Sequence, residues 1–257
     1  MTFRDLMIRT STLGTLSAGF LVFFPVLAIA EPTVTPSDQS FQQAVEQVVE
    51  QYIRSHPEVI EQTLQALQTK REDEERERVR QVIVTRQADL LSDPNSPISG
   101  DPKGDVTVVE FFDYRCGYCK RVAGTVTQLQ KDDPRVRVVY KDFPILGEAS
   151  ELAAKAALAS RAQGKHLAFH EALLASENEI TKEELLRIAN HVGLDTHRLQ
   201  ADMANPGWQA VIEKNRSLAR ELGITGTPGF IVGTEVVPGA LNLNRLKGLV
   251  AQTRKGQ

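Results

Sequence analysis

Residues 106–119 have the sequence Val-Thr-Val-Val-Glu-Phe-Phe-Asp-Tyr-Arg-Cys-Gly-Tyr-Cys, and this stretch decides the fold. Its β-branched and aromatic first half predicts a buried strand. The chain then turns at residues 113–115 and delivers Cys116 to the start of a helix predicted over residues 120–131. A sulfur at a helix N-terminus lies beside unpaired backbone N–H groups and the positive end of the helix dipole, so the thiolate is favoured.

Cys116 and Cys119 are the only cysteines in the 257 residues. Their spacing places both sulfurs on one helix face within bonding reach, which predicts a reversible dithiol/disulfide pair, Cys116–Cys119. Two other interpretations stay open. His166 and His170 could complete a zinc site, although they lie much further from Cys119 than zinc-finger spacing allows. The pair could also be a structural clip, although so short a loop removes little chain entropy.

The composition is that of an ordinary soluble protein, with 41% hydrophobic and 25% charged residues. The length suffices for one large domain or two small ones. The formal charge of −3 gives no reason to expect a nucleic acid or an anionic membrane surface as partner.

Residues 1–30 predict a signal peptide rather than part of the fold. A weakly basic start with Arg4 and Arg9 precedes a mostly apolar run over residues 13–27, and Ala28-Ile-Ala30 fits the small-x-small cleavage pattern. An uncleaved anchor is the alternative, although the run is short for a membrane span. Either way the body of the protein is exported, into a compartment where a lone cysteine pair is expected to form a disulfide during its cycle.

Residues 31–93 predict an N-terminal helical arm. Apolar residues recur on one face of a first helix and again, after Pro57, on one side of a second helix. They are Phe41, Val45, Val48, Tyr52, Ile60, Leu64 and Leu67. The run over residues 70–80 is charged at every position but one, and i,i+4 pairs from Glu72 to Arg76 and from Glu74 to Arg78 predict a solvated helix. The arm either packs on its own catalytic domain or associates with other copies of the chain.

The remaining pattern predicts an α/β domain. Residues 135–141 alternate as a strand does, and together with the first strand and its helix they form a βαβ unit with parallel strands. Residues 148–222 are helical throughout, with Thr181 and Glu184 spaced as a capping box. Two short strands over residues 229–233 and 235–238 and a last helix over residues 242–253 complete a βαβ…ββα frame with a helical insertion.

The strand–Cys-x-x-Cys–helix unit, the later Gly226-Thr-Pro228 ahead of a strand and the insertion between them resemble the thioredoxin fold of the DsbA-like family. Phe-Phe-Asp-Tyr-x-Cys-Gly-Tyr-Cys together with the arm is similar to the suppressor-of-copper-sensitivity C (ScsC) type. The resemblance covers residues 95–257 well and the arm only in general character. It implies a catalytic domain over residues 94–257, preceded by the arm.

The resemblance also implies roles for single residues. Cys116 is the exposed nucleophile, and Cys119 is the more buried partner that resolves the mixed disulfide. Glu110 is the buried acid, with a raised pKa, that shuttles the Cys119 proton. Strand alternation alone leaves open that Glu110 lies on an exposed face instead. Pro228 is the cis-proline that faces the disulfide, and Thr227 tunes the nucleophile. We expect substrate contacts at these two residues and at Gly117 and Tyr118.

One departure concerns the two residues between the cysteines. Gly117 and Tyr118 stand where the strong oxidase DsbA has Pro-His, so one donor that stabilises the thiolate is absent. Arg115, Lys120 and Arg121 place cations near the sulfur. These cations either compensate in part or form only a solvated rim.

The resemblance implies an exported enzyme that exchanges disulfides with substrate proteins and with a membrane-bound thiol redox partner. It needs no cofactor beyond the redox-active pair and no metal. If the arm assembles several copies into a homo-oligomer, the combined sites favour disulfide isomerisation. The alternatives are a monomeric DsbA-type oxidase and a protein that handles copper through its two thiolates.

Overall fold

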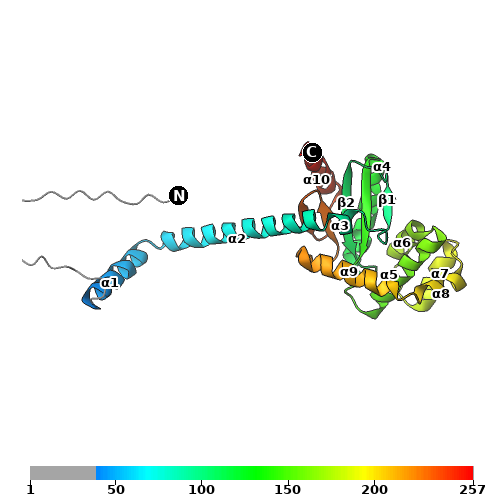
Figure 1. Cartoon of the computed structure of the whole chain (residues 1–257), viewed down its shortest axis with the longest axis horizontal. Coiled ribbons are helices and arrows are strands. Elements are labelled where there is room, and N and C mark those ends of the chain that lie inside the picture. Colours follow the sequence, from blue (N-terminus) through cyan, green and yellow to red (C-terminus); the bar gives the residue numbers. More distant parts are fainter. Residues whose placement is uncertain (1–38, 257) are drawn as a thin grey trace, which may run out of the picture. The chain divides into compact units, whose positions relative to one another are not determined.

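The computed structural model describes residues 39–256, so the predicted signal peptide lies outside the described residues. The chain divides after Thr63 into two compact units, which we describe separately. Helices and strands are labelled in Figure 1. Among residues 39–256, no helix combines the length and the apolar character that a membrane span requires.

The described part of the first unit is helical. It holds α1 (Gln39–Ser55) and the beginning of α2 (Glu58–Thr85), with Pro57 between them. The predicted apolar stripe on α1 is exposed at each of its four residues, Phe41, Val45, Val48 and Tyr52. The side chains of Val49 and Ile53, which were not predicted as part of it, are exposed as well. Exposed apolar side chains in such a row need a partner to be buried.

The charged run is part of α2, which confirms the predicted helix. The two predicted i,i+4 pairs are not the ion pairs that these arginines form, although the charge of Glu72 also raises the pKa of Arg76. Arg76 is paired with Asp73, and Arg78 with Glu75, both at a spacing of three residues. Each Arg has acids at both distances on the same helix face, so sequence spacing alone does not choose between them. All four side chains are solvent-exposed, so these pairs stabilise the helix only weakly.

A five-stranded mixed sheet forms the centre of the second unit, in the order β1-β3-β2-β4-β5. The strands are β1 (Ile98–Gly100), β2 (Val106–Phe112), β3 (Val136–Asp142), β4 (Gly229–Val232) and β5 (Glu235–Pro238). β2 and β3 are parallel and are joined through α4 (Gly117–Asp132), which confirms the βαβ unit. β1 was not predicted, because three residues between turns show no alternation.

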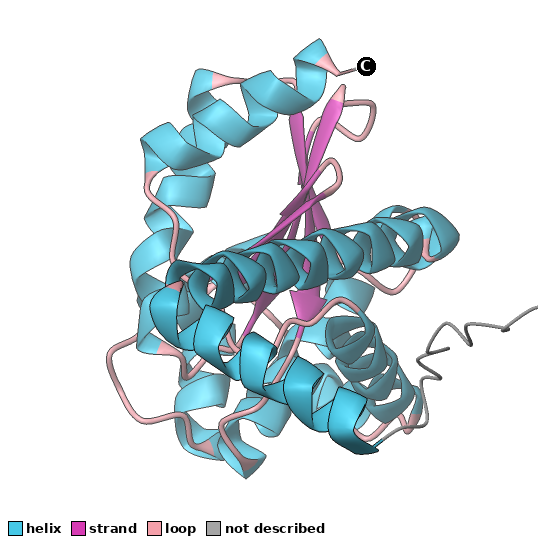
Figure 2. Cartoon of the chain, turned by 90° about the vertical axis from the view of Figure 1, so that its left-hand side faces the viewer, coloured by secondary structure: helices cyan, strands magenta, loops and turns pink. Residues whose placement is uncertain are grey.

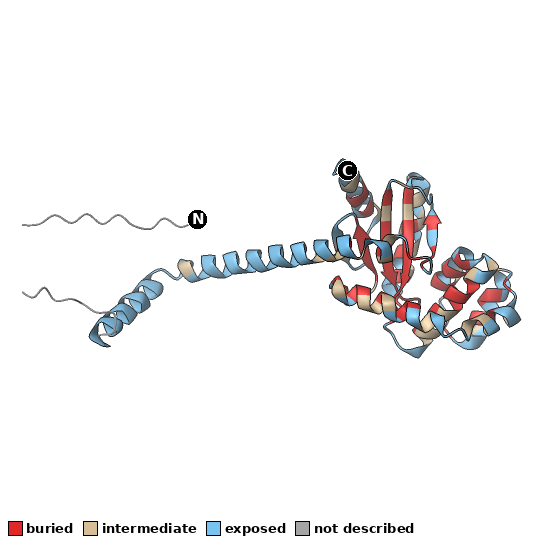
Figure 3. Cartoon of the chain, in the orientation of Figure 1, coloured by how far each residue is buried: buried red, intermediate tan, exposed pale blue. Residues whose placement is uncertain are grey.

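Helices cover both faces of the sheet (Figure 2). On one face Val108 and Phe112 pack against α4 and the helical insertion. On the other face Val109 and Phe111 pack against the end of α2 and α3 (Gln87–Leu91). The three central strands, β3, β2 and β4, are accordingly buried along most of their length (Figure 3), and β2 is almost continuously apolar for this reason.

The predicted insertion is confirmed as a run of helices. It comprises α5 (Glu148–Ser160), a 3-10 turn η1 (Arg161–Gln163), α6 (His166–Ala175), α7 (Lys182–His191), α8 (Thr196–Met203) and α9 (Gly207–Glu221). The capping box is present, since the Thr181 hydroxyl accepts a hydrogen bond from the Glu184 N–H at 3.1 Å. The last helix is α10 (Leu243–Lys255), and its N-cap is Asn242.

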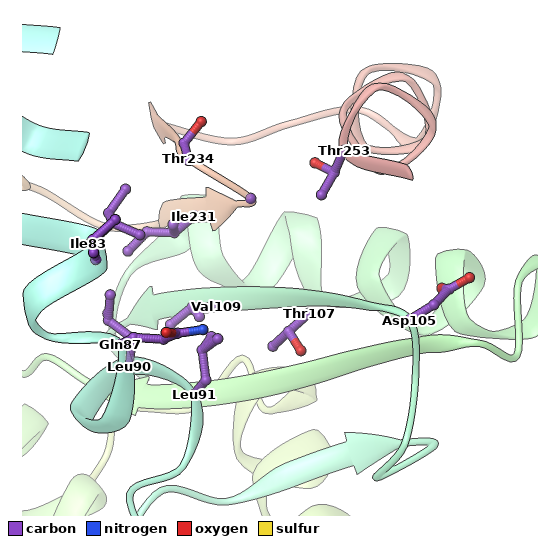
Figure 4. A pocket seen from close by; sticks show the side chains of 12 residues that line it. Ile83, Gln87, Leu90, Leu91, Asp105, Thr107, Val109, Ile231, Thr234 and Thr253 are labelled. Atoms are coloured by element: carbon purple, nitrogen blue, oxygen red, sulfur yellow. The ribbon is translucent and has the colours of Figure 1, made fainter. Parts of the chain in front are cut away.

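A cavity of about 290 Å³ lies on the α3 side of the sheet (Figure 4). Its lining is mostly apolar and includes Ile83, Leu90, Val109 and Ile231, all members of the core on that face. Both cysteines belong to the core on the opposite face. The cavity is therefore separate from the cysteine site.

Candidate active site

The cysteine loop begins where β2 ends at Phe112. Cys116 is the N-cap of α4, with extended backbone angles (φ −73°, ψ 114°), and its carbonyl accepts from the Lys120 N–H at 3.1 Å. The helix thus begins three residues before the predicted start, and Cys119 lies in its first turn. Both thiols are free in this structure, so their pairing as a disulfide stays a prediction. Cys116, expected to be the exposed nucleophile, is instead nearly buried, with 7% of the residue exposed, because it packs into the core with α4. Cys119 is fully buried.

The loop before β4 completes the site from a distant part of the chain. The Thr227–Pro228 peptide bond is cis. The Cys116 thiol donates a hydrogen bond to the Thr227 carbonyl at 3.2 Å. Antiparallel pairing of β2 with β4 brings these two loops together. Thr227 and Pro228 are therefore beside the cysteines, whereas their effect on the nucleophile stays a prediction.

Glu110 lies in the middle of β2, opposite Tyr140 on β3 and Phe230 on β4. The carboxyl is buried, with 3% of the residue exposed, so the open alternative of an exposed strand face is wrong. Alternation misleads here because β2 is covered on both faces. Burial raises the pKa of Glu110 to about 8. The role of this carboxyl as a proton shuttle stays a prediction.

The environment of Cys119 disfavours its thiolate. Burial raises the pKa of the Cys119 thiol far above its usual range, and the neighbouring Cys116 and Glu110 raise it further. Hydrogen bonds from the Asp113 backbone and the Thr227 hydroxyl act in the opposite direction. A thiol in this position needs a proton acceptor before it can attack a disulfide.

Each of the three cations near the sulfur already has another partner. The Arg115 guanidinium donates to the Leu146 carbonyl at 2.5 Å, and the Lys120 ammonium donates to the Ser176 carbonyl at 2.5 Å. Arg121 stacks 4.2 Å above the ring of Tyr118, which is 59% exposed. These contacts favour the interpretation that the three cations form a rim around the site. They argue against the alternative that the cations compensate for the thiolate-stabilising donor that is absent between the cysteines.

The two histidines of the zinc alternative belong to an aromatic cluster beneath the site. His170 Nδ1 is 3.0 Å from the Tyr114 hydroxyl, and its ring packs on Phe112 and Tyr140. His166 stacks on His170 at 5.7 Å. Burial lowers the pKa of His170 to about 3, so the ring is neutral. Over residues 39–256, no three His, Cys, Asp or Glu side chains are grouped as a metal site.

Two features of the site were not predicted from the sequence. The Tyr114–His170 contact joins residues 56 positions apart, and no local pattern predicts such a pair. Asp113 is buried and accepts several hydrogen bonds. The available signal for Asp113 was a lone carboxylate between an apolar strand and a helix start.

A βαβ…ββα frame with two cysteines at a helix start and a cis-proline loop beside them defines a thioredoxin-fold dithiol protein. Residues 107–251 match the DSBA-like thioredoxin domain, and residues 42–74 match the copper resistance protein ScsC N-terminal domain. The first match spans more than half of the chain. The protein therefore belongs to the DsbA-like thioredoxin-domain family of thiol–disulfide oxidoreductases.

Solved structures of similar proteins support this assignment. A thioredoxin-like oxidoreductase from Silicibacter pomeroyi is 49% identical, with a TM-score of 0.64 over 65% of this chain and 97% of that one. Proteus mirabilis ScsC in a transitional conformation is 27% identical, with a TM-score of 0.64 over 86% of this chain and 100% of that one. Salmonella enterica Typhimurium BcfH is 27% identical, with a TM-score of 0.68 over 84% and 96%.

Two kinds of curated relative are also similar. Disulfide bond formation protein D from Bacillus subtilis is 25% identical over 178 residues, which cover 63% of this chain and 78% of the relative. The Na(+)/H(+) antiporter NhaA 3 from Salinispora tropica is 31% identical over 155 residues, 60% of this chain and 24% of the relative. The chain spans about a quarter of the length of such antiporter relatives.

Proposed function

We propose that the protein is an exported thiol–disulfide oxidoreductase with disulfide isomerase activity, acting on protein disulfides through Cys116 and Cys119. The observation that carries the proposal is the position of the Cys116 thiol. It lies at the start of α4 and 3.2 Å from the Thr227 carbonyl of the cis-proline loop. A nucleophile at a helix N-terminus beside a peptide edge suits exchange with an extended polypeptide.

The exchange proceeds in two steps that balance atoms and electrons. The Cys116 thiolate attacks one sulfur of a substrate disulfide, which forms a mixed disulfide and releases the other sulfur as a thiol. Glu110, whose pKa is raised to about 8, acts in its ionised form: its carboxylate accepts the proton of Cys119, which attacks the Cys116 sulfur. The second substrate sulfur leaves as a thiolate and takes a proton from water. The substrate gains two electrons and the enzyme becomes the Cys116–Cys119 disulfide. The reverse sequence oxidises a substrate dithiol.

Substrate contacts are expected where the polypeptide can approach Cys116. Pro228 has no N–H and so donates no backbone hydrogen bond at this position. The backbone at Thr227 can therefore pair with an extended substrate peptide. Gly117 leaves room beside the sulfur, since only the Arg121 guanidinium comes within 4 Å of the position that a Cβ would take. The exposed Tyr118 ring offers an apolar contact.

The proposal is tested by equilibrating the reduced mature chain with glutathione redox buffers and measuring the fraction of protein with a Cys116–Cys119 disulfide. We expect one two-electron transition, together with catalysed re-sorting of a scrambled disulfide protein. Absence of exchange with both glutathione disulfide and the scrambled protein would refute the enzyme assignment.

Isomerase activity depends on the arm. The stripe on α1 is apolar and solvent-exposed, and the match of residues 42–74 to the ScsC N-terminal domain falls on this segment. We propose that residues 31–93 assemble a homo-oligomer through this stripe. Several cysteine sites tethered together then engage one misfolded client at several points, which raises their effective concentration.

Val45→Glu combined with Val49→Glu is expected to dissociate the oligomer, because two charges would be buried at the apolar stripe. Light scattering should give the mass of one chain, and the rate of disulfide re-sorting should fall about tenfold, while oxidation of a simple dithiol peptide persists. Gln43→Glu with Gln47→Glu adds the same charge elsewhere on α1 and serves as the control. Equal re-sorting by a monomeric variant and the wild type would contradict the isomerase proposal.

Export and a membrane-bound thiol redox partner are further parts of the proposal. They rest on the family relationship and on the predicted cleavage after Ala30. The mature protein recovered from the periplasm is expected to begin at Glu31, which N-terminal sequencing checks. A longer N-terminus in a membrane fraction would support the retained anchor instead.

Copper handling stays a second hypothesis, favoured by the match of the arm to a domain of a copper resistance protein. Two thiolates three residues apart can bind Cu(I). Titration of the reduced protein with Cu(I), against Cys116→Ser with Cys119→Ser, measures this directly. Uptake that does not depend on the thiols would refute it.

A further inference from the structure

The side chain of Asp113 lies between the cysteine loop and a second loop of the same domain. Asp113 is 1% exposed. Its Oδ1 accepts from the Arg115 N–H at 2.7 Å and from the Ser150 hydroxyl at 2.8 Å. Its Oδ2 accepts from the backbone N–H groups of Ile145 at 2.8 Å and Leu146 at 3.1 Å. One carboxylate thus joins the turn before Cys116 to the segment that leads from β3 into α5.

A second connection joins the same two loops. The Arg115 side chain donates to the Leu146 carbonyl at 2.5 Å. The Leu146 backbone is therefore held through both its N–H and its carbonyl by residues within three positions of Cys116. The side chains of Ile145 and Leu146 remain 40% and 44% exposed, although the backbone that carries them is fixed.

Apolar side chains on a hydrogen-bonded loop beside a nucleophile are suited to binding. Folding does not bury Ile145 and Leu146, and the loop lies next to the residue that precedes Cys116. Because the loop is already fixed, a substrate that docks there loses little of its binding free energy to loop ordering. Tyr118, in the first turn of α4 and two residues after Cys116, adds a third exposed side chain.

We propose that Asp113 is a positioning residue for substrate selection. It holds Ile145 and Leu146 beside Cys116, so that polypeptide disulfides with apolar residues next to their cysteines are preferred over polar ones. This inference rests on the proposed exchange activity and deepens it. Ile145, Leu146 and Tyr118 form the apolar rim, and the occupant of the rim is the substrate segment that flanks the reacting sulfur.

The substitution Asp113→Asn removes this connection with almost no change in shape. An amide oxygen can still accept from the Arg115 N–H and the Ser150 hydroxyl. The amide nitrogen would then face the N–H groups of Ile145 and Leu146, so that donors oppose donors. The loop is expected to separate from the cysteine turn, while Cys116, Cys119 and the cis-proline loop are chemically unchanged.

The experiment compares two mixed-disulfide peptides that differ only in the residues beside the cysteine, Leu and Ile in one and Ser and Thr in the other. kcat/KM is measured for both peptides and for glutathione disulfide. We expect the wild type to prefer the apolar peptide. Asp113→Asn should lower the ratio of kcat/KM for the apolar peptide to kcat/KM for the polar peptide about tenfold, mainly by raising KM for the apolar peptide. A merely structural role would lower all three values in proportion.

Two further variants make the test decisive. Ile145→Ser with Leu146→Ser changes only exposed side chains, so it tests the rim even if Asp113→Asn fails to fold, and it should reduce the same ratio. Asp195→Asn is the matched control, because Asp195 also accepts from two backbone N–H groups but lies at the start of α8. It should keep the wild-type ratio.

The possible outcomes separate the two proposals. The inference is supported if Asp113→Asn and the double variant Ile145→Ser with Leu146→Ser both lose the preference for the apolar peptide. The inference is overturned if the wild type does not prefer the apolar peptide, or if the variants at Asp113 or at Ile145 and Leu146 keep the wild-type preference. The proposed exchange activity is not affected by either result. A wild type that exchanges with no disulfide, glutathione included, overturns the proposed function and this inference with it.

Discussion

Cys119→Ser will accumulate covalent complexes with substrate proteins. Cys116 remains able to attack a disulfide, but the buried sulfur that would release the mixed disulfide is replaced by a hydroxyl. Turnover should fall by about two orders of magnitude or more. Non-reducing electrophoresis and mass spectrometry should show adducts that a reductant cleaves.

Cys116→Ser is the matched control, because it removes the other sulfur and conserves the size of the side chain. It should abolish both turnover and adduct formation, since Cys119 is fully buried and burial raises the pKa of its thiol. Adducts that form in Cys116→Ser but not in Cys119→Ser would reverse the two roles.

Glu110→Gln will stabilise the protein at neutral pH and slow its catalytic cycle. The pKa of Glu110 is about 8 in the folded protein and 4.5 in the unfolded chain, so the native state holds the extra proton between these values. The stabilisation from this group is complete below pH 4.5 and is lost as the pH rises through 8. At pH 7 the buried Glu110 lowers the free energy of unfolding by on the order of 3 kcal/mol, because the native state must keep its carboxyl protonated, and a neutral Gln removes this cost.

Urea unfolding at several pH values measures this effect. The slope of stability against pH between 5 and 8 should decrease in Glu110→Gln, although Asp142 keeps part of it, because burial also raises its pKa to about 8. Release of the mixed disulfide should slow, since the proton acceptor for Cys119 is gone. Glu177→Gln, at an exposed position, is the control. An unchanged slope would show that Glu110 is ionised in the native protein.

The parts of the fold that could be predicted are those with local causes. The apolar run of β2, the helix start at Cys116 and the capping Thr181 each follow from residues close together in the chain. The burial of Glu110 could not be derived from alternation. Glu110 shares the strand face of Val108 and Phe112, and α4 and the insertion cover this face only through long-range contacts. The contacts of Asp113 with Ile145 and of His170 with Tyr114 join residues 32 and 56 positions apart, beyond any local pattern.

The Cys116 thiol meets the Thr227 carbonyl across 111 positions of sequence. During synthesis the sulfurs leave the ribosome long before the proline segment that faces them. The nucleophile is therefore assembled only after the insertion and the late strand have joined the sheet. A chain whose insertion and late strand have not yet folded lacks the Thr227 contact at Cys116, and the proposed exchange chemistry waits for the last part of the domain.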